Sequence, residues 1–113
     1  MNATDNDTAR QSDMFEGLQV VMTQGIAAQD RNDQMDIMRR VRSFRFGTAK
    51  EVAAGTADSV HGGGDDPYKE HDFGSFRHND QNYFWKIDDY GEEWETHGVS
   101  QRHVLTVMQA NEY

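Results

Sequence analysis

Two alternating segments on either side of an Asn-Asp pair constrain the fold of this chain more than any other feature. Residues 70–77 read EHDFGSFR and residues 82–88 read NYFWKID. A period of two is typical of β-strands, and Asn79 followed by Asp80 suits a two-residue hairpin turn. The sequence therefore predicts an antiparallel hairpin over 70–77 and 82–88.

The turn determines which side chains share a face of this hairpin. We expect Phe76 to face Tyr83 and Gly74 to face Trp85. These rings, with Ile87, form one large apolar patch that we place beneath the helices. Glycine fits opposite the indole because the indole needs room above its partner.

The other face of the predicted hairpin suggests a catalytic site. It places His71 opposite Asp88, with Lys86 beside them. A carboxylate and an ammonium near an imidazole shift its proton affinity, so His71 would act as a general acid or base while Lys86 steadies an anion. One alternative is therefore a small enzyme or metal-dependent hydrolase that uses His71, Lys86 and Asp88.

A dense group of acids with one imidazole suggests a metal-binding site as a further alternative. Its candidate ligands are Asp65, Asp66, Glu70, His71 and Asp72. Divalent metals accept such ligands, but on a continuous strand Glu70 and Asp72 point one way and His71 the other. Because the spacing also matches no EF-hand loop, the leading expectation is a domain without a metal or another cofactor.

The acidic balance of the chain excludes some partners and favours others. The chain has 113 residues, enough for one domain, and a formal charge of −9. Nucleic acid and anionic membranes repel such a surface, whereas a basic protein surface or a nucleoprotein complex attracts it. Acids crowd positions 65–95, with Tyr90 and Trp94 as aromatic anchors among them. The predicted partner-binding residues are Asp65, Asp66, Asp89, Tyr90, Glu92, Glu93, Trp94 and Glu95.

The rest of the chain completes an α+β domain. Residues 1–7 read as a polar flexible tail before a single domain over 8–113. Residues 18–23 read as a buried strand, and Gly25 allows a turn. Helices are expected at residues 8–16, 33–44 and 101–113. The predicted fold is a small antiparallel sheet of about three strands, with two to three helices packed on one face.

Two segments lie outside that simple pattern. Residues 47–64 end in three glycines and read as a mobile loop with a helical turn near residues 50–54. A cluster of four arginines, Arg39, Arg40, Arg42 and Arg45, stands out in an acidic chain. It is either a solvated face paired with carboxylates or a contact for an anion or partner.

The location follows from what the sequence lacks. No apolar run approaches the roughly 20 residues needed to span a bilayer, and the N-terminus is polar throughout. The absence of cysteine removes disulfides and thiolate sites. The expectation is a cytoplasmic protein, with its oligomeric state left open.

Several ordered motifs resemble those of a bacterial, largely alphaproteobacterial, domain family of unknown function. They are DDPYKEHDFG at 65–74, YFWKID at 83–88 and VLTVMQANEY at 104–113, with VVMTQGI at 20–26 upstream. The family pattern is DPYxEHDFG, typically NDPYGEHDFG, then FWKIDYYD, then RVLTxMxxxEY. This chain departs from it with Asp65 for asparagine, Lys69 for glycine and Asp89 for tyrosine. The resemblance implies a shared fold and supplies no reaction.

The leading functional hypothesis is a small acidic protein-interaction module. Its most concrete form is an inhibitor of a bacterial defence nuclease or CRISPR complex that imitates the charge of nucleic acid. The grounds are the size of the chain, its charge and the density of acids between positions 65 and 95.

Overall fold

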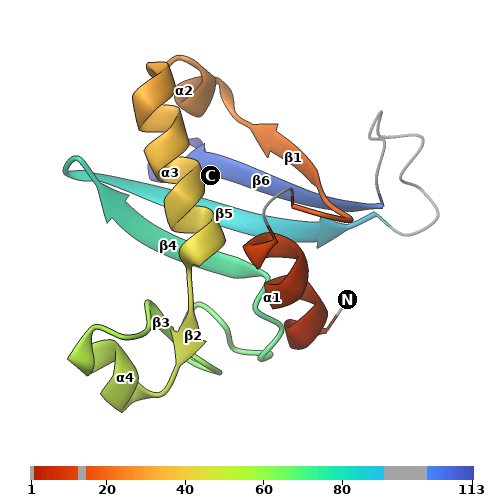
Figure 1. The fold of residues 1–113 in the computed structure, drawn as a ribbon, viewed down its shortest axis with the longest axis vertical. Coiled ribbons are helices and arrows are strands. Elements are labelled where there is room, and N and C mark those ends of the chain that lie inside the picture. Colours follow the sequence, from red (N-terminus) through yellow and green to blue (C-terminus); the bar gives the residue numbers. More distant parts are fainter. Residues whose placement is uncertain (1, 13–14, 91–101) are drawn as a thin grey trace.

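The computed structural model describes residues 2–12, 15–90 and 102–113 and shows an α+β fold (Figure 1). The helices are α1 (Ala3–Gln11), α2 (Gln24–Ala27), α3 (Arg31–Ser43), α4 (Ala49–Ala54) and the 3₁₀ helix η2 (Ala110–Glu112). The strands are β1 (Gln19–Met22), β2 (Phe46–Gly47), β3 (Ser59–Val60), β4 (Phe73–His78), β5 (Gln81–Asp89) and β6 (His103–Gln109). The predicted fold class is therefore confirmed.

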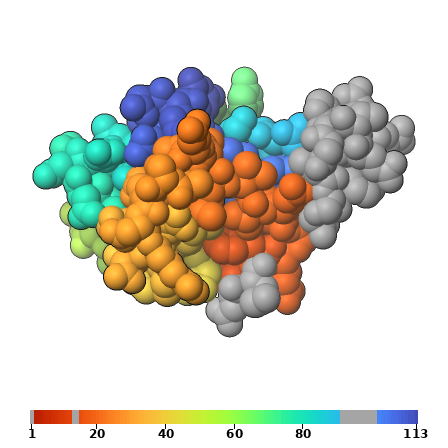
Figure 2. Space-filling view, turned by 90° about the horizontal axis from the view of Figure 1, so that it is seen from above, coloured from red at the N-terminus to blue at the C-terminus, as the bar shows by residue number. Residues whose placement is uncertain are grey.

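The main sheet has four strands in the order β1-β6-β5-β4. β4, β5 and β6 pair antiparallel, but β1 pairs with β6 in parallel, so the sheet is mixed and has one strand more than predicted. Helices α2 and α3 cross one face of this sheet (Figure 1). The C-terminal segment lies on the other side of the molecule from α3 (Figure 2). β2 and β3 form a separate parallel pair beside α4.

The hairpin of β4 and β5 has the predicted register. Phe76 pairs with Tyr83 and Gly74 with Trp85. Asn79 and Asp80 have φ angles of 50° and 63°, which are the positive values that a type I′ turn requires. The sequence signal was strong here because an Asn-Asp pair tolerates this backbone and the alternating rings permit one register.

The core lies between this hairpin and the helices. Trp85 is fully buried, with Phe76, Tyr83 and Ile87 beside it, as predicted. The residues of α1–α3 and their flanks that pack against these side chains are Ala9, Ile26, Ile37, Val41 and Phe44. Met35, elsewhere on α3, is 52% exposed. The buried stripe of α3 therefore follows Ile37, Val41 and Phe44.

Replacing Gly74 with alanine is expected to destabilise the domain by about 1–3 kcal/mol, because the added methyl group overpacks the core. An ideal Cβ at Gly74 would lie 2.6 Å from Cε2 of Trp85. Urea denaturation measures the effect, with Gly64→Ala as the control, since no atom of the described residues lies within 4 Å of a Cβ at Gly64. Equal stability of the two variants would contradict the close approach of β4 to the indole.

The C-terminal segment corrects the prediction of a helix over 101–113. It forms strand β6 and then η2. β6 is paired on both edges and buried on both faces, including Val104, Leu105, Val107 and Met108. Such a strand reads as a nearly continuous apolar run, and these four positions also fit the spacing of a helix face.

The N-terminus corrects a second prediction. The segment expected as a tail over 1–7 contains most of α1, which begins at Ala3. Asn2 caps the helix by accepting a hydrogen bond from the backbone of Asp5. The side chains that α1 buries include the polar residues Asn6 and Arg10, so the segment shows no apolar periodicity.

The remaining segments differ in smaller ways. The range 47–64 contains α4 and β3, and the expected helical turn is confirmed as α4, which Thr48 caps. Gly25 lies within α2, and β1 is a half-exposed edge strand. No helix among the described residues is long and apolar enough to cross a membrane.

Two members of the arginine cluster on α3 make contacts with neighbouring residues. Arg39 pairs with Asp36 at 2.9 Å. Arg40 donates to the backbone oxygen of Arg77 and lies over the ring of Phe76. The pair of Arg39 with Asp36 is of the kind expected for a solvated face paired with carboxylates, whereas Arg40 packs against strand β4.

Candidate metal centre

Asp66 organises the loop that leads into β4. The carboxylate is 1% exposed and accepts hydrogen bonds from the backbone N–H of Gly62 at 3.1 Å and of His71 at 2.9 Å. Lys69 and His71 have φ angles of 57° and 54°. Such left-handed conformations are costly for residues other than glycine. The hydrogen bond from the N–H of His71 to Asp66 helps to stabilise that of His71. The loop therefore turns the imidazole of His71 towards the buried carboxylate.

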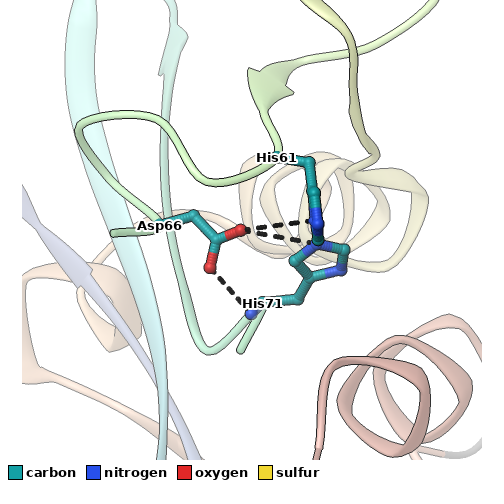
Figure 3. Close-up of side chains that lie close together, drawn as sticks. All are labelled: His61, Asp66 and His71. Carbon is teal, nitrogen blue, oxygen red and sulfur yellow. Dashed lines mark hydrogen bonds and ion pairs between the residues drawn. The ribbon is translucent and has the colours of Figure 1, made fainter. Parts of the chain in front are cut away.

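The pairing of β2 with β3 brings His61 to the same place. His61 directly follows β3, and its backbone N–H donates to the carbonyl of Gly47 at 2.8 Å. The Nδ1 atom of His61 lies 2.6 Å from Nε2 of His71. Oδ2 of Asp66 lies 3.8 Å and 3.4 Å from these two nitrogens (Figure 3). We call these three side chains the His61–Asp66–His71 cluster.

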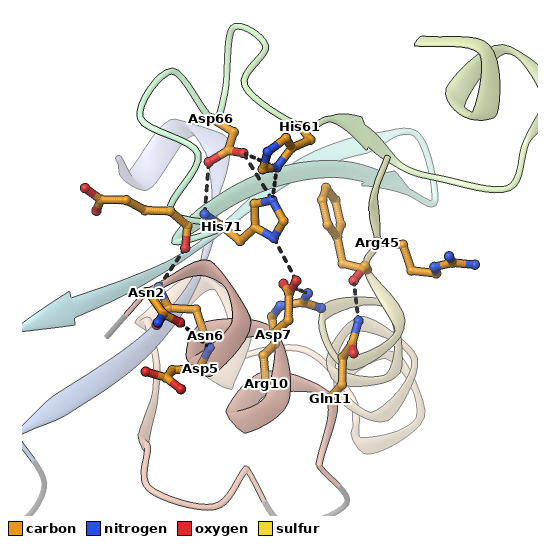
Figure 4. Close-up of polar contacts among 12 residues, drawn as sticks. Asn2, Asp5, Asn6, Asp7, Arg10, Gln11, Arg45, His61, Asp66 and His71 are labelled. Carbon is orange, nitrogen blue, oxygen red and sulfur yellow. Dashed lines mark hydrogen bonds and ion pairs between the residues drawn. The ribbon is translucent and has the colours of Figure 1, made fainter. Parts of the chain in front are cut away.

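Helix α1 holds the imidazole of His71 from the other side. Oδ2 of Asp7 lies 2.7 Å from Nδ1 of His71, and Oδ1 of Asp7 lies 3.1 Å from Arg10 (Figure 4). Phe46 stacks on the imidazole with centroids 4.2 Å apart. Because a carboxylate only accepts hydrogen bonds, Asp7 fixes the proton of His71 on Nδ1 and leaves Nε2 as a lone-pair donor.

Arg10 is the buried anchor of this arrangement. Its side chain is fully buried and donates to the carbonyls of Val41 at 2.7 Å and Arg42 at 3.3 Å. Its guanidinium carbon lies 4.7 Å from the ring centroid of Trp85. Burial lowers the pKa of Arg10, while its hydrogen bond to Asp7 raises it. The network thus links the core to the imidazole of His71.

Two imidazoles and one carboxylate form a ligand set for a divalent transition metal. One ligand atom from each of the three residues lies within 4.8 Å of the others. The side chain of His61 is 46% exposed, so the cluster is open to solvent on that side. A carboxylate on the outer nitrogen of a ligating histidine, as Asp7 provides, is the usual support for such a ligand.

The sequence identified part of this cluster. Of the predicted metal ligands, Asp66 and His71 lie in it. Asp65 is exposed and accepts from the hydroxyl of Ser75, and Glu70 and Asp72 line a separate pocket. His61 and Asp7 were missed. His61 lies only ten residues before His71 and could have been noticed by spacing, whereas nothing local marks Asp7.

The predicted catalytic arrangement is wrong because β4 begins at Phe73 and not at residue 70. His71 lies in the preceding loop, and its ring contacts Asp7, Asp66 and His61 instead of Asp88. Lys86 and Asp88 do lie together at 3.0 Å, and this hydrogen bond raises the pKa of Lys86.

The predicted partner-binding surface is described only in part. Asp66 is buried, so it cannot be a surface residue of the folded domain. Asp65 and Asp89 are exposed, Asp89 pairs with Arg102 at 2.8 Å, and Tyr90 is half-buried. The other members, Glu92, Glu93, Trp94 and Glu95, lie outside the described residues.

The fold and the cluster together define a small α+β domain with a two-histidine, one-carboxylate site. The chain belongs to the DUF3768 family, proteins of unknown function, whose model matches residues 22–112. This confirms the resemblance to a domain family of unknown function. The matched range contains His61, Asp66 and His71, while Asp7 precedes it. No curated protein and no solved structure gives a significant match to the chain.

Proposed function

We propose that the domain binds one divalent transition-metal ion, zinc in first place, through His61 Nδ1, His71 Nε2 and Asp66 Oδ2, and that the ion serves hydrolysis. The observation that carries this proposal is the convergence of the three ligand atoms within 4.8 Å. Structural zinc sites close with four protein ligands, whereas catalytic sites keep three and an open position. A bound ion would supply activation of water at that position.

The distances suit an ion after a small movement of one side chain. Two nitrogens bound to a tetrahedral zinc ion at about 2.0–2.1 Å each lie about 3.3 Å apart. The separation of Asp66 Oδ2 and His71 Nε2 is already 3.4 Å, but the two imidazole nitrogens are 2.6 Å apart. His61 therefore has to retreat by less than 1 Å, and its exposed side chain has room to do so.

The first test is the metal content of protein purified without a histidine tag. We expect about one equivalent of zinc after reconstitution, measured by mass spectrometry of the metal. Excess zinc should raise the free energy of unfolding by about 2.7 kcal/mol at a free concentration 100 times the Kd. Protein that retains no metal and has the same unfolding midpoint with and without zinc would overturn the proposal.

Two matched variants separate the cluster from other histidines. His61→Gln is expected to lose zinc affinity by at least about 100-fold, since it removes a ligand from an exposed position at little cost to the fold. His103→Gln removes a histidine outside the cluster and should bind as the wild type does. Hydrolysis of activated esters and phosphoesters is then compared between the wild type and His61→Gln. Equal rates would refute the hydrolytic part.

We also propose, as a second function, an interaction with a basic protein partner such as a bacterial defence nuclease or CRISPR complex. The observation that favours it is a surface pocket lined by four carboxylates, those of Glu70, Asp72, Asp88 and Asp89. The net charge of −9 adds long-range attraction to a basic surface.

A further inference from the structure

The pocket of four carboxylates lies between α1, the loop before β4 and the paired strands β5 and β6. Its volume is about 210 Å³, and Asn6 and His103 complete its polar wall. Asn6 is next to Asp7 on α1, and Glu70 and Asp72 flank His71. Neighbouring residues on α1 and on the loop before β4 therefore line the pocket and form the metal centre. The two sites share no side chain.

The acids of this pocket are only partly neutralised. Asp88 pairs with Lys86, and Asp89 pairs with Arg102. Within residues 2–12, 15–90 and 102–113, no lysine, arginine or histidine nitrogen lies within 4.0 Å of the carboxylates of Glu70 or Asp72. Two neighbouring carboxylates that lack a paired cation favour the binding of a cation beside them.

Asn6 gives a second and independent indication of a ligand. Asn6 is 3% exposed, and its Nδ2 donates to the backbone oxygen of Glu70 at 2.8 Å (Figure 4). That bond fixes the orientation of the amide, and its Oδ1 remains a buried acceptor without a hydrogen-bond donor among the described residues. Buried acceptors are rarely left unpaired, so the wall of the pocket lacks a donor.

The geometry favours an organic cation over a metal ion. The described clusters whose ligand atoms lie within 4.8 Å of one another are His61–Asp66–His71 and Asp33–Asp36–His78, and neither includes an acid of this pocket. A small ion therefore would not find three of these carboxylates converging on it. The volume is also below the roughly 300 Å³ at which pockets for whole small molecules begin, which suits a single side chain.

We propose that this pocket binds the guanidinium group of an arginine side chain presented by a basic protein. A guanidinium carries five N–H donors in a plane and can bond several carboxylates at once. Glu70 and Asp72 accept its charge-assisted hydrogen bonds, and Asn6 provides a further acceptor beside them. This inference gives the interaction with a basic partner a specific site, and it does not rest on the metal centre.

The experiment is a titration of ¹⁵N-labelled protein with N-acetyl-arginine amide, followed by NMR. We expect saturable shifts of backbone signals at residues 70–72 and 87–89 and at Asn6. N-acetyl-citrulline amide, which has the same shape and no charge, should cause none of them. Asp72→Asn should weaken binding at least about tenfold, because it removes the negative charge from one of the hydrogen bonds to the guanidinium. Asp80→Asn removes the same charge from the exposed hairpin turn and should leave the Kd unchanged.

Several outcomes would overturn the proposal. They are equal shifts with citrulline, equal weakening by Asp72→Asn and Asp80→Asn, and displacement of the arginine ligand by micromolar Mg²⁺ or Ca²⁺, which would make the pocket a metal site. The His61→Gln variant separates this proposal from the first one. Arginine binding that persists in His61→Gln supports a pocket independent of the metal, whereas its loss there would refute that independence.

Discussion

Replacing Arg10 with methionine is expected to destabilise the domain by about 3 kcal/mol, a large share of the stability of a domain this size. The guanidinium satisfies the carbonyls of Val41 and Arg42. Methionine fills similar space but has no donor, so the backbone oxygens of Val41 and Arg42 lose the guanidinium, and Val41 keeps only the weaker bond from the N–H of Phe44 at 3.4 Å. Loss of the stacking over Trp85 adds to the cost. Urea denaturation monitored by tryptophan fluorescence measures the change.

Two further variants make this result interpretable. Arg10→Lys keeps the charge but not the fork of donors, and we expect it to recover only part of the stability. Arg39→Met changes an exposed arginine that pairs with Asp36 on the surface of α3, and it should cost less than about 0.5 kcal/mol. If Arg10→Met and Arg39→Met were equally stable, the buried position of Arg10 would be wrong.

Arg10 also shows why the sequence placed the start of the N-terminal helix at residue 8, although α1 begins at Ala3. Periodicity detects a helix by its apolar stripe, but α1 buries Asn6 and Arg10 beside Ala9. Their burial is possible because each finds a partner more than 30 residues away, in Val41 for Arg10 and Glu70 for Asn6. A local pattern contains no information about such partners.

The two ends of the sheet illustrate the same limit. The register of β4 and β5 could be predicted because the turn at Asn79 and Asp80 is local. β6 was taken for a helix because its partner β1 lies more than 80 residues away, as in the pair Gln19 and Val104. Only that parallel pairing makes β6 a central strand.

The site was predictable to the extent that its residues are close in sequence. Asp66 and His71 fall within one turn-rich segment, and the acids around them suggested a metal site as an alternative to a domain without metal. The positive φ at His71 could not be foreseen, because no glycine marks it. That angle reverses the expected direction of the imidazole, from Asp88 on β5 to His61 and Asp7.

Replacing Asp7 with asparagine is expected to reduce the zinc affinity of the His61–Asp66–His71 cluster by about 10–100-fold, the usual effect of removing a carboxylate behind a ligating histidine. The oxygen of asparagine can still accept from Nδ1 of His71, but the negative charge behind the ligating ring is lost. Asp7→Ala should reduce the affinity further, because His71 then also loses its orientation. A competition titration against a chelator of known affinity measures both.

A merely structural role of Asp7 would leave a different signature. In the metal-free wild type, long-range ¹H–¹⁵N NMR should show His71 protonated on Nδ1 at a pH where the ring is neutral, since Asp7 accepts that proton at 2.7 Å. Asp7→Ala should shift the population towards protonation on Nε2, the nitrogen that the metal needs. Asp5→Asn removes an exposed carboxylate from the same helix and should change neither tautomer nor affinity. An Asp7→Asn variant that binds zinc as tightly as Asp5→Asn would show that α1 supports the fold without tuning the metal centre.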